Sequence, residues 1–397
     1  GGGVGKSFLI QKYIQNNKHS NYIGVTSLTG TSAILIKGST LHSFLGIGLG
    51  KKPVQVLAQK ILKKSYLKKR WKQIQVLIID EVSMLSCELF EKIEKLARLI
   101  RDIYEPFGGI QLICSGDFCQ LPVIGSTQFC FESKVWDDCI DETVYLTEIV
   151  RQKDKEFVNV LNNIRLGNIT ENVKKVLNER VGVKLQTKNG IRPTRLFCLN
   201  KDVNSTNTKK LMKIIKKQET ELRTYTLIKT ITLKKNKFSV DKCIRQLPVN
   251  IELKLTKNAQ VMLVYNLNIK EGMVNGARGV VTDFNQHGLP YVKFMNGKEQ
   301  LIDYHIWDFE EDNKSIGTAK QIPLRLAYAS TIHKLQGSTI DYSNLYLNDV
   351  FEYGMAYVAL SRVRSLHGLS IKSINYAQIK AHPKAVEYYK KLTENQK

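Results

Sequence analysis

The first seven residues, GGGVGKS, constrain the fold of this chain more than any other feature of its sequence. Gly5, Lys6 and Ser7 fill the last three places of the phosphate-binding loop pattern G-x-x-x-x-G-K-[ST], whose first glycine would precede Gly1. Such a loop joins a buried strand to a helix. We therefore expect a helix over residues 7–14 and a fragment that lacks the supporting strand. We further expect this piece alone to bind nucleotide poorly or to fold badly.

The loop also predicts the chemistry of a bound nucleotide. Its backbone N–H groups point at phosphates, its lysine bridges the β- and γ-phosphates, and its hydroxyl ligates Mg²⁺. We therefore expect ATP and Mg²⁺ as cofactors, with Lys6 on the phosphates and Ser7 on the metal. The residues predicted to bind nucleotide are Gly2, Gly3, Val4, Gly5, Lys6 and Ser7.

Two carboxylates follow a wholly apolar stretch at residues 76–79, which is typical of a strand buried in a parallel sheet. Asp80, at the end of that stretch, is expected to hold Mg²⁺ directly or through water. Glu81 is expected to polarise the attacking water as a general base. The alternative is an acidic turn on the surface, which the preceding apolar run disfavours.

Three further residues complete the predicted catalytic set. Gln120, in GDFCQLP after another apolar stretch at residues 110–114, is expected to sense the γ-phosphate or to orient water. Arg151 and Arg362 are expected to be arginine fingers that stabilise charge on the transferred phosphoryl group. Both arginines fall in a second α/β unit, so closure of two lobes would depend on ATP. The alternative for either arginine is a surface ion pair.

Strands alternate with helices along most of the chain, which predicts an α/β protein built around a doubly wound sheet. The first domain is expected to span residues 1–145. A second unit of the same kind is expected at 146–212 and again at 321–397. Between its two parts, residues 213–320 contain alternating segments and Asn-Gly turns that predict a small β-rich insertion.

The charge of the chain favours a polyanionic partner. It has 397 residues and a formal net charge of +24, and nucleic acid is the first candidate for such an excess. The alternative is the compositional bias of an AT-rich genome, because Lys, Asn and Ile are all abundant. Residues 51–75 hold nine Lys or Arg and no acid, which indicates either a strand-contacting surface or a solvated helical face. Seven cysteines without a C-x-x-C pair favour reduced thiols and no zinc site.

Together these residues resemble the Pif (petite integration frequency) family of superfamily-one DNA helicases, which is related to the bacterial RecD type. The similarity covers nearly the whole chain and is most specific at PFGGIQL, residues 106–112, which leads into GDFCQLP. Further matching residues are Gly30 and the segments 40–44, 46–48, 260–263, 274–276, 278–281, 330–334, 336–339 and 357–362.

The resemblance implies two RecA-like phosphate-loop NTPase domains with an SH3-like insertion in the second. It also implies an ATP-dependent helicase that moves 5′ to 3′ on single-stranded DNA and unwinds forked or structured duplexes. Such a monomeric motor would act in DNA repair, recombination, replication or telomere maintenance. Because hydroxyls and imidazoles suit hydrogen bonds to phosphate, the residues expected to contact DNA are Thr29, Thr40, His42, Thr331, His333 and Gln336.

A second hypothesis is a DNA-binding remnant of a viral or mobile-element helicase that no longer unwinds DNA. The complete catalytic set favours an active enzyme, because decay is expected to remove some of its members. A nucleotide kinase or a signalling GTPase would share only the phosphate loop, and it would not explain two lobes, two arginines and the basic charge.

Overall fold

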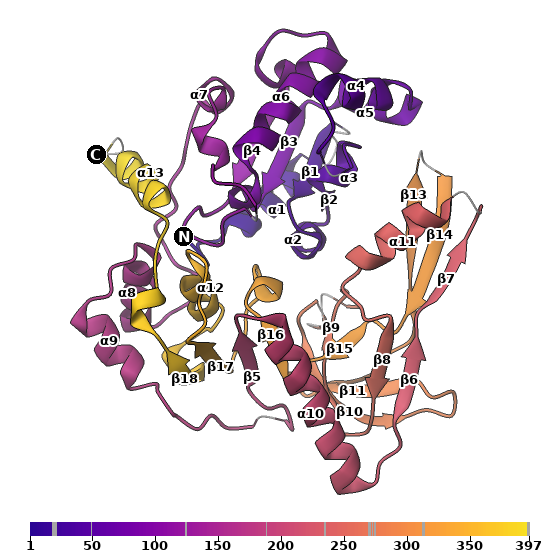
Figure 1. Ribbon diagram of the computed structural model, residues 1–397, viewed down its shortest axis with the longest axis vertical. Coiled ribbons are helices and arrows are strands. Elements are labelled where there is room, and N and C mark those ends of the chain that lie inside the picture. The colour runs from indigo at the N-terminus through magenta and orange to yellow at the C-terminus, as the bar shows by residue number, and fades with distance from the viewer. Residues whose placement is uncertain are drawn as a thin grey trace. The chain divides into compact units, whose positions relative to one another are not determined.

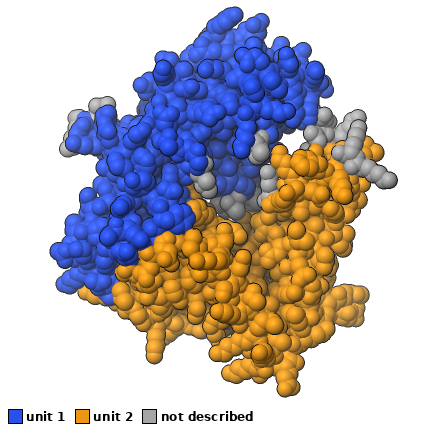
Figure 2. All heavy atoms as spheres, in the orientation of Figure 1, with its two compact units in different colours: residues 1–178, 350–366, 375–397 blue, residues 179–349, 367–374 orange. Residues whose placement is uncertain are grey.

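The chain forms two compact units, each built from segments that are far apart in the sequence (Figure 2). The computed structural model describes residues 1–17, 22–48, 50–123, 125–187, 189–233, 236–268, 271, 273, 275–311 and 314–394. Unit 1 comprises residues 1–178, 350–366 and 375–397, and unit 2 comprises residues 179–349 and 367–374.

A parallel four-stranded sheet forms the core of unit 1, with the strand order β2-β1-β3-β4 (Figure 1). Its strands are β1 (Ile23–Ser27), β2 (Ser39–Thr40), β3 (Val76–Asp80) and β4 (Gln111–Ser115). Successive side chains of β3 point to opposite faces: Leu77 and Ile79 join one apolar cluster, and Ile78 packs in another with Ile10. Both faces of β3 are therefore covered, which explains why the strand is apolar over its first four residues.

The helices of unit 1 come from all three of its segments. The longest of them, α6 (Cys87–Arg101), is capped by the preceding Ser86, whose hydroxyl accepts a hydrogen bond from the N–H of Leu89 at 3.2 Å. The others are α1 (Lys6–Asn16), α2 (Gly30–Leu35), α3 (Leu41–Phe44), α4 (Val54–Leu62), α5 (Ser65–Gln73), α7 (Trp136–Cys139), α8 (Lys155–Arg165), α9 (Glu171–Asn178), α12 (Met355–Ser361) and α13 (Pro383–Glu394).

Unit 2 combines a parallel sheet with antiparallel β-structure. The parallel sheet has the order β16-β5-β17-β18, and the antiparallel parts are β12-β11-β10-β9-β15, β13-β14-β7 and β6-β8. The strands are β5 (Thr194–Phe197), β6 (Arg223–Thr226), β7 (Ile228–Ile231), β8 (Glu252–Leu255), β9 (Gln260–Leu263), β10 (Arg278–Phe284), β11 (Pro290–Phe294), β12 (Glu299–Leu301), β13 (His305–Glu311), β14 (Lys314–Gln321), β15 (Leu324–Leu326), β16 (Ala329–Thr331), β17 (Ser343–Leu347) and β18 (Leu369–Ile374), and the helices are α10 (Asn200–Gln218) and α11 (Lys237–Gln246).

The two parallel sheets confirm the α/β class, but the compact units differ from the predicted domain limits. Residues 146–178, 350–366 and 375–397 belong to unit 1, whereas they were expected in the second domain. One physical reason is that α12, whose seven residues are all buried, packs against α8 within unit 1. The β-rich region also extends beyond residue 320, because β15 pairs with β9.

All seven cysteines are free thiols. In the described ranges, no helix combines the length and the apolar character that crossing a membrane requires.

Candidate nucleotide-binding site

The glycine-rich loop ends where α1 begins, and its conformation depends on glycine. Gly3 and Gly5 have φ angles of 80° and 87°, in the left-handed region that a side chain disfavours. At Gly3, a Cβ would also lie 2.8 Å from the Cβ of Arg151. The loop conformation therefore depends on glycine and leads directly into the N-terminus of α1, the kind of helix terminus whose backbone N–H groups bind phosphate.

Lys6 is the first residue of α1 and is held next to the loop. Its Nζ donates a hydrogen bond to the carbonyl oxygen of Gly1 at 2.6 Å. Burial lowers the pKa of Lys6, whereas the carboxylates of Asp117, Glu81 and Asp80 act in the opposite direction. These interactions bring the lysine and both predicted acidic residues into one electrostatic cluster.

The two predicted carboxylates lie where β3 ends. Asp80 is 4% exposed, and burial raises its pKa while the Ser115 hydroxyl and the charge of Lys6 oppose that shift. Glu81 has φ 57° and ψ 42°, a left-handed conformation that costs a non-glycine residue about 1–2 kcal/mol. Backbone strain of this kind is concentrated at functional sites.

The residues predicted to hold Mg²⁺ offer the correct donor chemistry. Ser7 and Asp80 supply a hydroxyl and a carboxylate, the hard oxygen ligands that Mg²⁺ prefers. Within the part of the chain that the structure describes, no group of three His, Cys, Asp or Glu side chains could hold a metal unaided. A magnesium ion here would therefore need phosphate oxygens and water as its other ligands, which is its usual mode of binding in nucleotide sites.

Both predicted finger arginines contact the loop region within unit 1. The backbone N–H of Arg151 donates to the carbonyl of Gly3 at 3.1 Å, and its Nη1 donates to the carbonyl of Ser361 at 3.1 Å. Burial and then the charge of Arg362 lower the pKa of Arg151 to about 9. A Cβ on Gly2 would lie 3.5 Å from Nη2 of Arg362.

The side chain of Arg362 is folded against its own helix. Arg362 is 2% exposed, its Nε donates to the carbonyl of Val358 at 3.0 Å, and its Nη2 donates to the hydroxyl of Ser361 at 2.8 Å. Both arginines were expected in a unit separate from the loop, whereas the structure places them in the same compact unit, where α8 and α12 pack together and Arg151 contacts the loop.

The side chain of Gln120 is 4% exposed and lies near this cluster. It lies next to Asp117, which was not among the residues predicted for the site. Its Nε2 approaches Oδ2 of Asp117 at 3.4 Å, and among the described residues its Oε1 has no hydrogen-bond partner. Asp117 is itself fully buried and forms a 2.9 Å ion pair with Nη2 of Arg165. Burial by itself raises the pKa of Asp117, but the Arg165 guanidinium outweighs burial and holds that pKa well below its usual range.

Several interactions hold the Arg165 side chain in place. Its Nη1 donates to the Tyr145 hydroxyl at 3.1 Å, and its guanidinium lies 4.2 Å from the ring centroid of Tyr389. Asp117 could have been noted from its place in GDFCQ, but Arg165 stands 48 residues away and carries no recognisable spacing. The pair connects the Gln120 loop to α8.

Replacing Arg165 by methionine is expected to lower the free energy of unfolding by about 3–5 kcal/mol, because it leaves the Asp117 carboxylate buried and unpaired. Urea denaturation followed by tryptophan fluorescence, to which Trp71 and Trp136 of unit 1 contribute, measures the change. Adding Asp117→Asn should restore most of the lost stability. Lys174→Met, which breaks an exposed pair with Glu171, is the control. A loss no larger than that of the control would contradict a structural role for the buried pair.

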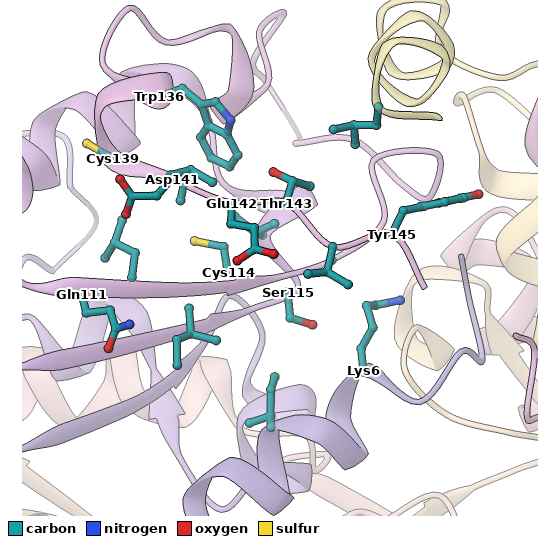
Figure 3. A pocket seen from close by; sticks show the side chains of 18 of the residues that line it. Lys6, Gln111, Cys114, Ser115, Trp136, Cys139, Asp141, Glu142, Thr143 and Tyr145 are labelled. Atoms are coloured by element: carbon teal, nitrogen blue, oxygen red, sulfur yellow. The ribbon is translucent and has the colours of Figure 1, made fainter. Parts of the chain in front are cut away.

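A cavity of about 1030 Å³ follows the outer edge of β4 in unit 1, between α1 and residues 138–146 (Figure 3). Figure 3 shows Gln111 toward one end and Lys6 toward the other. In the sheet, β4 pairs with β3 on one side only. The buried strand expected before the loop stays a prediction.

The residues predicted to contact DNA are divided between the units. Thr29, Thr40 and His42 belong to unit 1, and Thr331, His333 and Gln336 belong to unit 2. Thr29 caps the start of α2 by accepting a hydrogen bond from the N–H of Ser32 at 3.1 Å, and Thr40 precedes α3. Burial lowers the pKa of His42. Thr331 and Gln336 are only 3% and 6% exposed, so their assignment as DNA contacts stays a prediction.

The basic segment 51–75 forms α4 and α5, and most of its charged side chains are exposed. Arg70 is the exception: it donates to the carbonyl of Phe44 at 2.7 Å and lies 4.9 Å from the centroid of that ring. Both interpretations of the segment, a strand-contacting surface and a solvated face, stay predictions.

Similarity to known proteins agrees with this geometry. A profile described as PIF1-like helicase matches residues 1–175, and one described as DNA helicase Pif1, 2B domain, matches residues 244–284. The ATP-dependent DNA helicase PIF1 of Xenopus laevis is 39% identical over 98% of this chain, and the chain spans 60% of that protein's length.

Solved structures are also similar. The Bacteroides Pif1 helicase in complex with ADP-AlF3 and ssDNA is 29% identical with a TM-score of 0.70, covering 99% of this chain and 92% of that one. The Pif1 helicase from Candida albicans is 33% identical with a TM-score of 0.84, covering 98% of this chain and 94% of that one. The chain shares its fold with the Candida albicans helicase, is 33% identical over 94% of that protein's chain, and matches both family profiles. It therefore belongs to the family of PIF1-like helicases.

Proposed function

We propose that this chain is an ATP-dependent DNA helicase that translocates 5′ to 3′ on single-stranded DNA. The observation that carries the proposal is the cluster in unit 1 that gathers Lys6, Asp80, Glu81, Arg151 and Arg362 around a glycine-rich loop. Membership of a family whose named relatives are ATP-dependent DNA helicases supports the same activity. The direction of movement rests on the family resemblance.

Each member of the cluster has a distinct part in the proposed hydrolysis. Lys6 binds the β- and γ-phosphates, while Ser7 and Asp80 would hold Mg²⁺, which neutralises phosphate charge when bound. Glu81 accepts the proton of the attacking water. Arg151 and Arg362 stabilise the charge that spreads over the γ-phosphoryl oxygens, so the enzyme binds the transition state more tightly than the substrate.

Gln120 is assigned to the attacking water rather than to the γ-phosphate. Its amide N–H₂ group faces the acceptor-only carboxylate of Asp117, which leaves Oε1 as the unpaired atom among the described residues. A free carbonyl oxygen accepts a hydrogen bond from water but repels a phosphate oxygen. Gln120 therefore orients water in this proposal.

The proposed partners are single-stranded DNA and forked or structured duplex DNA, bound by a monomeric motor. The net charge of +24 suits a phosphate backbone, and a solved relative is described in complex with ssDNA. We also propose that the β-rich insertion is SH3-like. The cellular processes proposed for the helicase are DNA repair, recombination, replication and telomere maintenance.

Strand displacement on duplexes with a 5′ or a 3′ single-stranded tail tests activity and direction together. We expect unwinding of the 5′-tailed substrate only, with ATP hydrolysis that single-stranded DNA accelerates. Because binding depends on phosphate contacts, both signals should fall steeply as salt rises. Hydrolysis that does not respond to DNA would refute the helicase assignment. DNA binding without hydrolysis would instead support the remnant of a viral or mobile-element helicase.

A further inference from the structure

Residues 150–152 form a short bridge inside unit 1 between the glycine-rich loop and the end of α12. The N–H groups of Val150 and Arg151 both donate to the carbonyl of Gly3, at 2.9 and 3.1 Å. This backbone contact places the next side chain, Gln152, directly beneath the loop. Gln152 is 2% exposed, so its amide must find its partners inside the protein.

The amide nitrogen of Gln152 donates both of its hydrogens to the backbone around Arg362. Nε2 lies 3.0 Å from the carbonyl oxygen of Ser361 and 2.9 Å from that of Val363. These two carbonyls belong to the residues on either side of Arg362. A single side chain therefore holds the peptide on both flanks of the predicted finger.

The other end of the same amide faces the loop. A Cβ built on Gly3 would lie 3.2 Å from Oε1 of Gln152. Among the described residues this buried oxygen has no hydrogen-bond partner. The Gln152 amide thus lies between the loop and Arg362. Its N–H₂ group is hydrogen-bonded on the Arg362 side, and its oxygen faces the loop.

We propose that Gln152 is a positioning residue that fixes Arg362 relative to the phosphate-binding loop. The inference rests on the proposed function, because it assigns Gln152 to the placement of an arginine finger. Glutamine suits this place through its chemistry: glutamate lacks the two donors, methionine has no donor and only a weakly accepting sulfur, and asparagine is one methylene shorter. Arg151 reinforces the same point, because its Nη1 also donates to the carbonyl of Ser361.

The test compares Gln152→Met and Gln152→Glu with the wild type and with Gln378→Glu, an exposed glutamine of the same unit. Steady-state ATP hydrolysis with single-stranded DNA gives kcat and KM, and titration with a fluorescent ADP analogue gives the nucleotide Kd. We expect kcat to fall about 100-fold in both variants, the size of effect that a 1 Å misplacement of a catalytic group produces. The nucleotide Kd should change by less than about threefold, because the finger acts on the transition state.

A double-mutant cycle separates positioning from simple packing. If Gln152 acts through Arg362, adding either substitution to Arg362→Ala should reduce kcat by less than about twofold further. A full additional 100-fold loss, an equal loss of nucleotide affinity, or unchanged kcat would each overturn the proposal. Unfolding of both Gln152 variants, judged by circular dichroism, would show that the amide serves packing and would overturn it as well. A wild-type protein without DNA-stimulated hydrolysis would refute the proposed function instead, so the two failures are distinguishable.

Discussion

Replacing Lys6 by alanine is expected to reduce ATP hydrolysis to background, a loss of at least about 10²–10³-fold in kcat. The ammonium group is buried among the carboxylates of Asp117, Glu81 and Asp80 and next to the loop. Its removal leaves the phosphate oxygens without their lysine and leaves these carboxylates facing an anionic substrate. Both changes act on binding and on the transition state, so nucleotide affinity should fall together with kcat.

Lys12→Ala provides the matched control for this variant. Lys12 lies on the same helix, α1, but its side chain is exposed, and its ammonium group lies over the ring of Phe8, which is also exposed. Phosphate release measured with single-stranded DNA, together with titration of a fluorescent ADP analogue, should show normal behaviour for Lys12→Ala. Substantial hydrolysis by Lys6→Ala would show that the glycine-rich loop does not carry the reaction.

Replacing Arg362 by alanine is expected to slow hydrolysis by about 10³–10⁵-fold while nucleotide binding persists. The guanidinium is buried beside the loop, and its electrostatic partners include Glu81. Its hydrogen bonds to the carbonyl of Val358 and the hydroxyl of Ser361 keep it close to its own helix. An arginine finger stabilises charge that exists only as the phosphoryl group is transferred, so its loss should affect kcat far more than Kd.

Single-turnover hydrolysis and nucleotide titration of the same preparation distinguish the two quantities. Arg245→Ala, an exposed arginine on α11, is the control for removing one positive charge. Parallel losses of binding and hydrolysis in Arg362→Ala would argue against a finger. They would indicate instead that the guanidinium supports the fold of the loop.

Much of unit 1 was predictable from the sequence because its signals are local. The apolar run at residues 76–79 predicted β3, and the structure confirms a strand buried on both faces. The pattern around Lys6 predicted α1, which begins at that residue. In both cases the information lies within a few neighbouring residues, where steric and hydrogen-bonding preferences act directly.

The location of the arginines was predicted less well. Arg151 and Arg362 were identified as finger candidates, but they were expected in a different unit from the loop. Their actual placement depends on α12 packing against α8 and on the backbone contact between Arg151 and Gly3. Contacts between segments about 150–200 residues apart produce no local periodicity or residue spacing from which they could be predicted.

The sequence by itself determined which residues make up the candidate site: a predicted phosphate-binding loop, two carboxylates at the end of an apolar strand, a glutamine and two arginines. Only the tertiary structure decided how these groups are held. It pairs Asp117 with Arg165, and it lets the Gln152 amide donate hydrogen bonds to the carbonyls on both sides of Arg362. It also packs Gly354 so tightly that a Cβ there would lie 2.5 Å from the carbonyl oxygen of Gln120. The physical reason is that catalytic residue types and their spacing follow from local chemistry, whereas their supports are buried hydrogen bonds and close contacts that exist only once distant segments have packed together.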